Sequence, residues 1–194
     1  MTKLLASVAI AALLSVAACS PKAPPADTAA PADTASTEPM APLPAATSPA
    51  QDFATGVAYG DMLEIAASKA AQAKSTNKDV KAYATMLIRD HTAASAKLKA
   101  LATNASLTLP ETLDSGRQLL ADNIANAEGG SGFDDKYLDT VIDAHEAAIS
   151  KFEAYARDGA DPALKQFATD TLPTLQAHFN RGKTIRDAVN RAGN

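Results

Sequence analysis

Apolar residues recur at alternating steps of three and four along much of the chain. The clearest case runs from Val80 to Leu101, where one stripe of such positions is apolar throughout except for His91. The stripe consists of Val80, Ala84, Leu87, His91, Ala94, Leu98 and Leu101. This spacing places the stripe on one face of a helix and predicts that the face is buried in a bundle.

Three other segments have the same periodicity and the same kind of exception. Residues 138–155 and 164–189 each carry one histidine in the stripe, and residues 53–71 carry a glutamate. The polar residues at the stripe positions of the four segments are Glu64, His91, His145 and His178. The pattern therefore predicts four helices. Each helix directs into a common core one side chain that is able to bind a metal.

The connections between these segments predict how the helices are ordered. A short turn near Thr76 joins the first two helices, and one near Gly159 joins the last two. The connection over residues 104–132 is long, and residues 112–127 within it are periodic enough for a short extra helix. The predicted fold is all-α: a four-helix bundle of two helical hairpins joined by a long crossover, which is the topology of ferritin-like bundles.

Distances along the helices test whether the four polar residues can meet. At about 1.5 Å per residue, Glu64 and His91 lie about 18 and 22 Å from the first turn. His145 and His178 lie about 21 and 28 Å from the second turn on the same rise. Within each hairpin the two groups therefore differ in level by roughly one helical turn, which permits a shared site.

The N-terminal residues predict a lipid anchor. Residues 1–18 have a positive start, a short apolar run and small residues before Cys19, the only cysteine of the chain. This is typical of a secretory signal, and it resembles the bacterial lipoprotein signal, in which Cys19 would become the lipidated N-terminus. A serine follows, which by resemblance to sorting in Gram-negative bacteria indicates the outer membrane. A plain signal peptide with a chance cysteine is the alternative.

Residues 19–50 and 51–194 differ sharply in composition. Residues 19–50 are rich in proline, alanine and threonine and contain a near-repeat, PADTA. Such a segment is expected to be a disordered tether. Residues 51–194 are long enough for one helical domain with its own core.

Charge and composition exclude several classes of function. The net charge is −4 and no basic patch is evident, which argues against nucleic acid as a partner. No second apolar run is long enough to span a bilayer, so the lipid is the expected membrane contact. With Cys19 lipidated, the domain has no thiol for catalysis, and no nucleophile motif of a hydrolase is recognisable. The sequence predicts no particular reaction.

Several motifs carry a family resemblance. They are IRDH at Ile88–His91, the stretch FDDKYLDTVIDAHEAAISKFEAYA at Phe133–Ala156, and TLPTLQAHF at Thr171–Phe179. Together with the glutamate of the first segment, they resemble the DUF4142 family of bacterial exported proteins, which is grouped with ferritin-like folds. The resemblance implies this fold and a role for Glu64, His91, His145 and His178. It implies no activity.

The chain departs from di-iron ferritin-like proteins, which carry Glu-x-x-His on two helices. The residues three positions before the histidines are Ile88, Ile142 and Leu175, so the bridging carboxylates are missing. Asp90 and Glu146 adjoin histidines in sequence and point about 100° away from them, so we expect them to contact the histidines from the side or to contact neighbouring helices. Asp61, one turn before Glu64, is a further candidate acid beside the site.

Two readings of the polar stripe residues remain open. Three imidazoles and a carboxylate suit one divalent transition metal, which could be zinc, copper, iron or nickel. Alternatively, the same residues form a buried hydrogen-bonded network without a metal, in a structural or stress-related binding module of the cell envelope.

Overall fold

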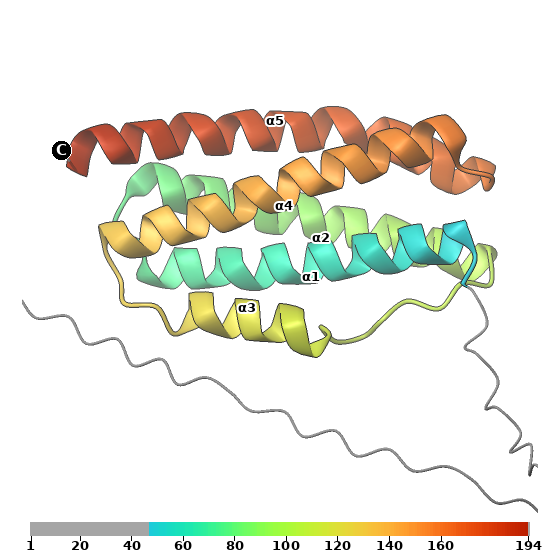
Figure 1. Cartoon of the computed structure of the whole chain (residues 1–194), viewed down its shortest axis with the longest axis horizontal. Coiled ribbons are helices and arrows are strands. Elements are labelled where there is room, and N and C mark those ends of the chain that lie inside the picture. Colours follow the sequence, from blue (N-terminus) through green and yellow to red (C-terminus); the bar gives the residue numbers. More distant parts are fainter. Residues whose placement is uncertain (1–46, 194) are drawn as a thin grey trace, which may run out of the picture. The chain divides into compact units, whose positions relative to one another are not determined.

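The structure, a computed structural model, describes residues 47–193 (Figure 1). This part of the chain contains five α-helices and no strand, which confirms the all-α prediction. The helices are α1 (Pro49–Lys74), α2 (Lys78–Asn104), α3 (Ser115–Ala125), α4 (Ser131–Asp158) and α5 (Pro162–Gly193). The predicted signal sequence, Cys19 and most of the predicted tether lie outside the described residues.

Most helix starts follow from local capping. The side chains of Asn77 and Asp161 accept hydrogen bonds from backbone amides at the starts of α2 and α5. Helix α1 begins at Pro49, before the periodic segment 53–71. Ser48 accepts from the Gln51 amide at 3.1 Å, and proline suits the first helical position. The last two residues assigned to the tether therefore belong to α1.

The long crossover also differs in detail from expectation. Its helix α3 is shorter than the predicted 112–127, because Asp114 caps it by accepting from the Arg117 amide at 2.8 Å. Helix α4 begins at Ser131 rather than near Asp134. Gly130 precedes it with a φ of 100°, a conformation that favours glycine, and this lets the chain turn directly into the helix.

The four long helices lie side by side in two hairpins (Figure 1). Helices α1 and α2 form one hairpin and α4 and α5 the other, and α1 packs on α4 while α2 packs on α5. The short helix α3 lies against α1 and also contacts α4. None of the helices among residues 47–193 is long and apolar enough to cross a membrane.

The core consists of two apolar clusters with a polar layer between them. One cluster includes Leu87 and Leu138, and the other includes Phe53 and Phe152. On each long helix, the stripe histidine or glutamate falls in sequence between residues of the first cluster and residues of the second. The fold thus holds the polar residues at one level of the bundle, enclosed by apolar packing on both sides.

Candidate metal centre

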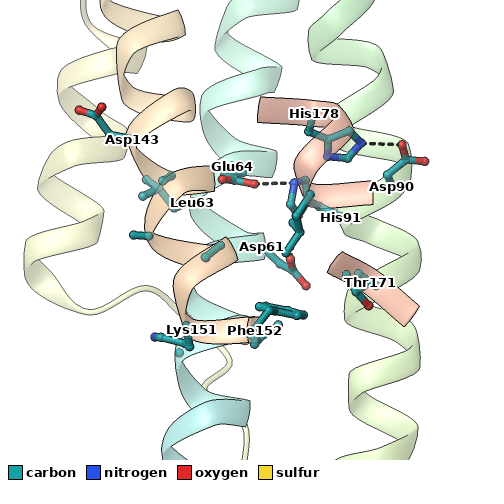
Figure 2. Close-up of a pocket in the computed structure, with 18 of the residues that line it drawn as sticks. Asp61, Leu63, Glu64, Asp90, His91, Asp143, Lys151, Phe152, Thr171 and His178 are labelled. Carbon is teal, nitrogen blue, oxygen red and sulfur yellow. Dashed lines mark hydrogen bonds and ion pairs between the residues drawn. The ribbon is translucent and has the colours of Figure 1, made fainter. Parts of the chain in front are cut away.

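Three histidines from three helices converge in the polar layer. His91 of α2, His145 of α4 and His178 of α5 are all buried, with 5%, 0% and 2% of their surface exposed. Each offers one ring nitrogen, and these nitrogens all lie within 4.8 Å of one another. Histidines spaced far apart in sequence are therefore close enough to share one ion. Figure 2 shows His91 and His178 facing the same space.

The other nitrogen of each ring is held by an acceptor. The contacts join His91 Nδ1 to Asp61 Oδ1 at 2.8 Å, His145 Nδ1 to the Val141 carbonyl oxygen at 2.7 Å, and His178 Nε2 to Asp90 Oδ2 at 2.9 Å. A ring that donates from one nitrogen presents the lone pair of the other. This arrangement leaves His91 Nε2, His145 Nε2 and His178 Nδ1 as the atoms available to a metal.

Glu64 of α1 completes the group. Its carboxylate is buried, with Oε2 2.5 Å from His91 Nε2 and Oε1 3.2 Å from His145 Nδ1 (Figure 2). Glu64 Oε2 and His91 Nε2 form a buried ion pair when His91 is protonated, and neither atom has another hydrogen-bond partner among the described residues. Without a cation, a buried carboxylate beside an imidazole lone pair would be costly. A metal ion could take the place of the proton between them.

The charges of the site favour a positive ion beside Glu64. Burial alone would raise the pKa of Glu64, but the fields of His91 and His145 outweigh burial and lower it. Burial alone would lower the pKa of His91, but Glu64 and Asp61 outweigh burial and raise it to about 10. Without a metal, a proton on His91 therefore supplies the positive charge that the carboxylates require.

His178 sits in a different electrostatic environment from His91. Burial lowers the pKa of His178, and the contact with Asp90 opposes burial without cancelling it. Arg89 and His178 hold the pKa of Asp90 below its usual range, so Asp90 is an ionised acceptor. A neutral His178 that donates to this carboxylate is in the protonation state that metal binding requires.

Of the three acids predicted to lie near the histidines, the structure brings two into contact with them and leaves one exposed. Asp61 contacts His91, and Asp90 contacts His178 of a neighbouring helix rather than His91, which follows it in sequence. Glu146 is exposed, and its backbone carbonyl accepts from Ser150 at 3.2 Å. The structure does not bring the Glu146 side chain to the histidines. Adjacent helical residues point about 100° apart, and no neighbouring helix packs where Glu146 points.

Sequence reasoning missed two supports of the site. Ser95 Oγ donates to Asp61 Oδ2 at 2.8 Å, which holds the second oxygen of that carboxylate. The Tyr83 hydroxyl donates to the His178 carbonyl oxygen at 2.9 Å and ties α2 to α5 beside the histidine. Ser95 lies one turn after His91, so its sequence position places a hydroxyl beside the site. Tyr83 has no such signal, because it lies two turns before His91 and its partner is a backbone carbonyl oxygen of α5.

A pocket of about 590 Å³ adjoins the histidines (Figure 2). All five helices contribute residues to its lining, and Glu64, His91 and His178 lie among them. His145 does not line the pocket and lies on the closed side of the group.

Comparisons with known sequences and structures place the chain in a family and a fold. Residues 35–185 match the family described as Domain of unknown function (DUF4142), which confirms the resemblance seen in the sequence. No curated protein matches the chain in sequence. The structure resembles a DUF305 fragment from Deinococcus radiodurans, with a TM-score of 0.65 and 11% identity, covering 75% of this chain and 99% of that one.

The structure also resembles CopM, which has been solved in Cu(II)-bound and Cu(I)-bound forms. Both have a TM-score of 0.60, with 18% and 16% identity, and cover 72% of this chain and 96% of CopM. At these identities the likeness establishes a shared helical fold and nothing about the site.

Proposed function

Since the chain belongs to the DUF4142 family, whose function is unknown, we propose a function from its site: it binds one divalent transition metal ion. The ligands are His91, His145 and His178, with Glu64 as the fourth. The observation that carries the proposal is that three buried imidazoles converge while an acceptor holds the second nitrogen of each ring. This is how metal-binding histidines are usually oriented.

The buried charge of Glu64 supports the same conclusion. In the metal-free arrangement Glu64 Oε2 has a cationic partner only when His91 is protonated. A bound metal ion would supply that positive charge instead, since a carboxylate and an imidazole are both good ligands for such an ion.

Copper is the first metal to test, and zinc is the second. Neutral imidazole suits copper, zinc, iron and nickel, and the usual affinity order places Cu(II) above the others. The residues that form the site and line its pocket include no methionine or cysteine, which favours Cu(II) over Cu(I). CopM, a protein of similar fold, has been solved in copper-bound forms, which makes copper a practical first choice for the titration.

The proposal includes a cellular setting and a finer fold. The run of small residues before Cys19 supports a lipid anchor, through which the domain would be held at the outer membrane by a tether. Two hairpins joined by a long crossover support a ferritin-like arrangement. The single carboxylate at the site favours one metal ion over the two of di-iron ferritin-like proteins.

A metal-free network is the second candidate function for these residues. His145 Nε2 lies 3.2 Å from His178 Nδ1, so a proton shared by these atoms could link Asp90, His178 and His145 in one chain. Such a chain would fix the register of the helices in a structural or binding module of the envelope. In this network the protonated ring of His91 is the partner of Glu64 Oε2.

Calorimetric titration of the demetallated protein with Cu(II) and Zn(II) distinguishes the two candidates. A metal site gives saturable binding of one ion per chain, and elemental analysis of the protein purified without a histidine tag gives the same ratio. His91→Ala removes the binding, whereas Glu146→Ala, which changes an exposed acid beside His145, leaves it intact. A metal-free network gives no saturable binding in any of these proteins.

A further inference from the structure

The pocket beside the metal centre has one polar end and an apolar wall. Glu64, His91 and His178 form the polar end. The apolar side chains of the wall include Val57, Leu63, Leu120, Ala144, Ala148 and Phe152. Its volume of about 590 Å³ falls within the range of small-molecule sites, about 300–1,000 Å³. Figure 2 shows Leu63 and Phe152 on the approach to Glu64 and His91.

A glycine in the buried stripe of α1 keeps this space open. Gly60 lies one turn before Glu64, where the other stripes carry larger side chains. A Cβ added at Gly60 would meet nothing within 4 Å. Gly56, one turn earlier, is different, because its Cβ would lie 2.3 Å from Lys151 Nζ. The lysine therefore covers α1 at Gly56, and the empty space begins at Gly60, next to the metal ligands.

The charged residues in the pocket lining indicate the character of an occupant. Arg117, Lys151 and Asp143 line the pocket and carry charges of both signs, so its entrance does not select strongly for an anion or a cation. The interior wall is apolar. At the inner end, Glu64 and His91 present a carboxylate and an imidazole to the pocket. An occupant with an apolar body and one polar head matches all three regions.

We propose that the pocket binds a small molecule with an apolar, ring-sized body and one nitrogen or oxygen donor, which coordinates the metal from the pocket side. This rests on the proposed metal site. His91, His178 and Glu64 line the pocket, whereas His145 is fully buried and does not, so an added ligand would reach the ion from the pocket. The apolar body then lies against Leu63 and Ala144, in the space that Gly60 leaves free.

Two probe compounds test the proposal on the Cu(II)-loaded full chain. Imidazole supplies a donor alone, and 4-phenylimidazole supplies the same donor with an apolar ring. Titration followed by the copper absorption and resonance spectra should show binding of both, with 4-phenylimidazole on the order of tenfold tighter because its ring is buried. Equal affinity for the two probes would overturn the proposal.

Filling the pocket should remove the preference for the phenyl ring. Two variants fill the pocket: Gly60→Phe on α1 and Ala144→Phe on α4. Each should make the affinities for 4-phenylimidazole and imidazole about equal, while the copper content stays at one ion per chain. Gly132→Phe is the matched control, since Gly132 also faces open space but does not line the pocket. A phenyl preference that survives both pocket variants would contradict the proposal.

A metal-free measurement separates this proposal from the proposed function. In the demetallated protein, 4-phenylimidazole should shift the nuclear magnetic resonances of Gly60 and Ala144, and the shifts should be lost in Ala144→Phe. If these shifts occur but no copper binds, the pocket takes the ligand and the metal site is wrong. If copper binds but these resonances do not move and the phenyl advantage is absent, the metal site stands and the ligand proposal is wrong.

Discussion

Asp90 lies beside His91 in sequence but contacts His178, whose Nε2 is 2.9 Å from Asp90 Oδ2. The two residues belong to α2 and α5, so the contact crosses between the two hairpins. It fixes the tautomer and direction of His178, which then presents Nδ1 to the other histidines. Asp90, which is partly exposed at the side of the bundle, thereby orients the buried ring of His178.

Removal of the Asp90 carboxylate should weaken metal binding without unfolding the protein. In Asp90→Ala the ring of His178 loses the acceptor that orients it, and loss of such an acceptor typically costs about 10–100-fold in metal affinity. Calorimetric titration with Cu(II) measures the change. Asp79→Ala, another acid of α2 in an exposed ion pair, is the control and should bind like the unaltered protein. Equal affinities in the two variants would rule out this role.

Truncation of His145 should affect both stability and binding. The side chain is fully buried and bonds to the Val141 carbonyl oxygen and to His178. His145→Ala leaves a cavity and unpaired polar atoms, so we expect a loss of about 2–4 kcal/mol in the free energy of unfolding. Urea denaturation of the metal-free proteins measures it. Glu146→Ala is the control, and its free energy of unfolding should stay within about 0.5 kcal/mol of that of the unaltered protein. An equally small change in His145→Ala would contradict the buried network.

The raised pKa of His91 predicts how stability depends on pH. The folded-state pKa is about 10 and the ordinary value is 6.5, so protonation of His91 favours the folded state. This stabilisation is complete below about pH 6.5 and is lost as pH rises toward 10. The metal-free protein should therefore lose its stability advantage over His91→Gln across this window. Urea denaturation of both proteins at several pH values measures the difference, and a pH-independent difference would be contrary to expectation.

Metal affinity should rise over the pH range in which the stability of the metal-free protein falls. The ion and the proton compete for His91, so binding should strengthen from pH 7 toward 9 instead of levelling off just above the ordinary histidine range. Proton release measured by titration in buffers of different ionisation enthalpy tests this. Release of no proton near neutral pH would mean that His91 is not a ligand.

The sequence predicts which polar residues meet in the core better than it predicts their surroundings. Helical periodicity places Glu64, His91, His145 and His178 on the buried faces of their helices, and the structure brings them together. The partners of those residues depend on how the helices are rotated and aligned against each other. For this reason Asp90 could be placed near the site but not paired with His178, and Glu146 was expected near the histidines although it faces solvent.

The pocket could not be foreseen for a similar reason. Gly60 is visible in the stripe of α1, but a glycine there would also fit close packing of two helices. Whether the space is filled or empty depends on how all five helices that line it pack together. The start of α1 at Pro49 was by contrast predictable, because Ser48 and Pro49 form a recognisable capping sequence.

The predicted lipid anchor calls for a test in cells. Cys19→Ser removes the thiol to which the lipid would be attached, so the variant should move from the membrane fraction to the soluble fraction of the envelope. Ser20→Ala, which leaves the cysteine in place, is the control and should remain with the membrane. A Cys19→Ser protein that fractionates like the parent would show that the chain is held by something else.

The most direct test of the account is X-ray absorption at the copper edge of the Cu(II)-loaded protein, because it reports the ligands themselves. The site predicts one ion bound by three imidazoles, with the remaining scattering from oxygen, and two imidazoles in His145→Ala if that variant still holds copper. Copper surrounded by fewer than three imidazoles in the unaltered protein, or no copper retained after dialysis, would contradict the assignment of His91, His145 and His178 as a metal centre.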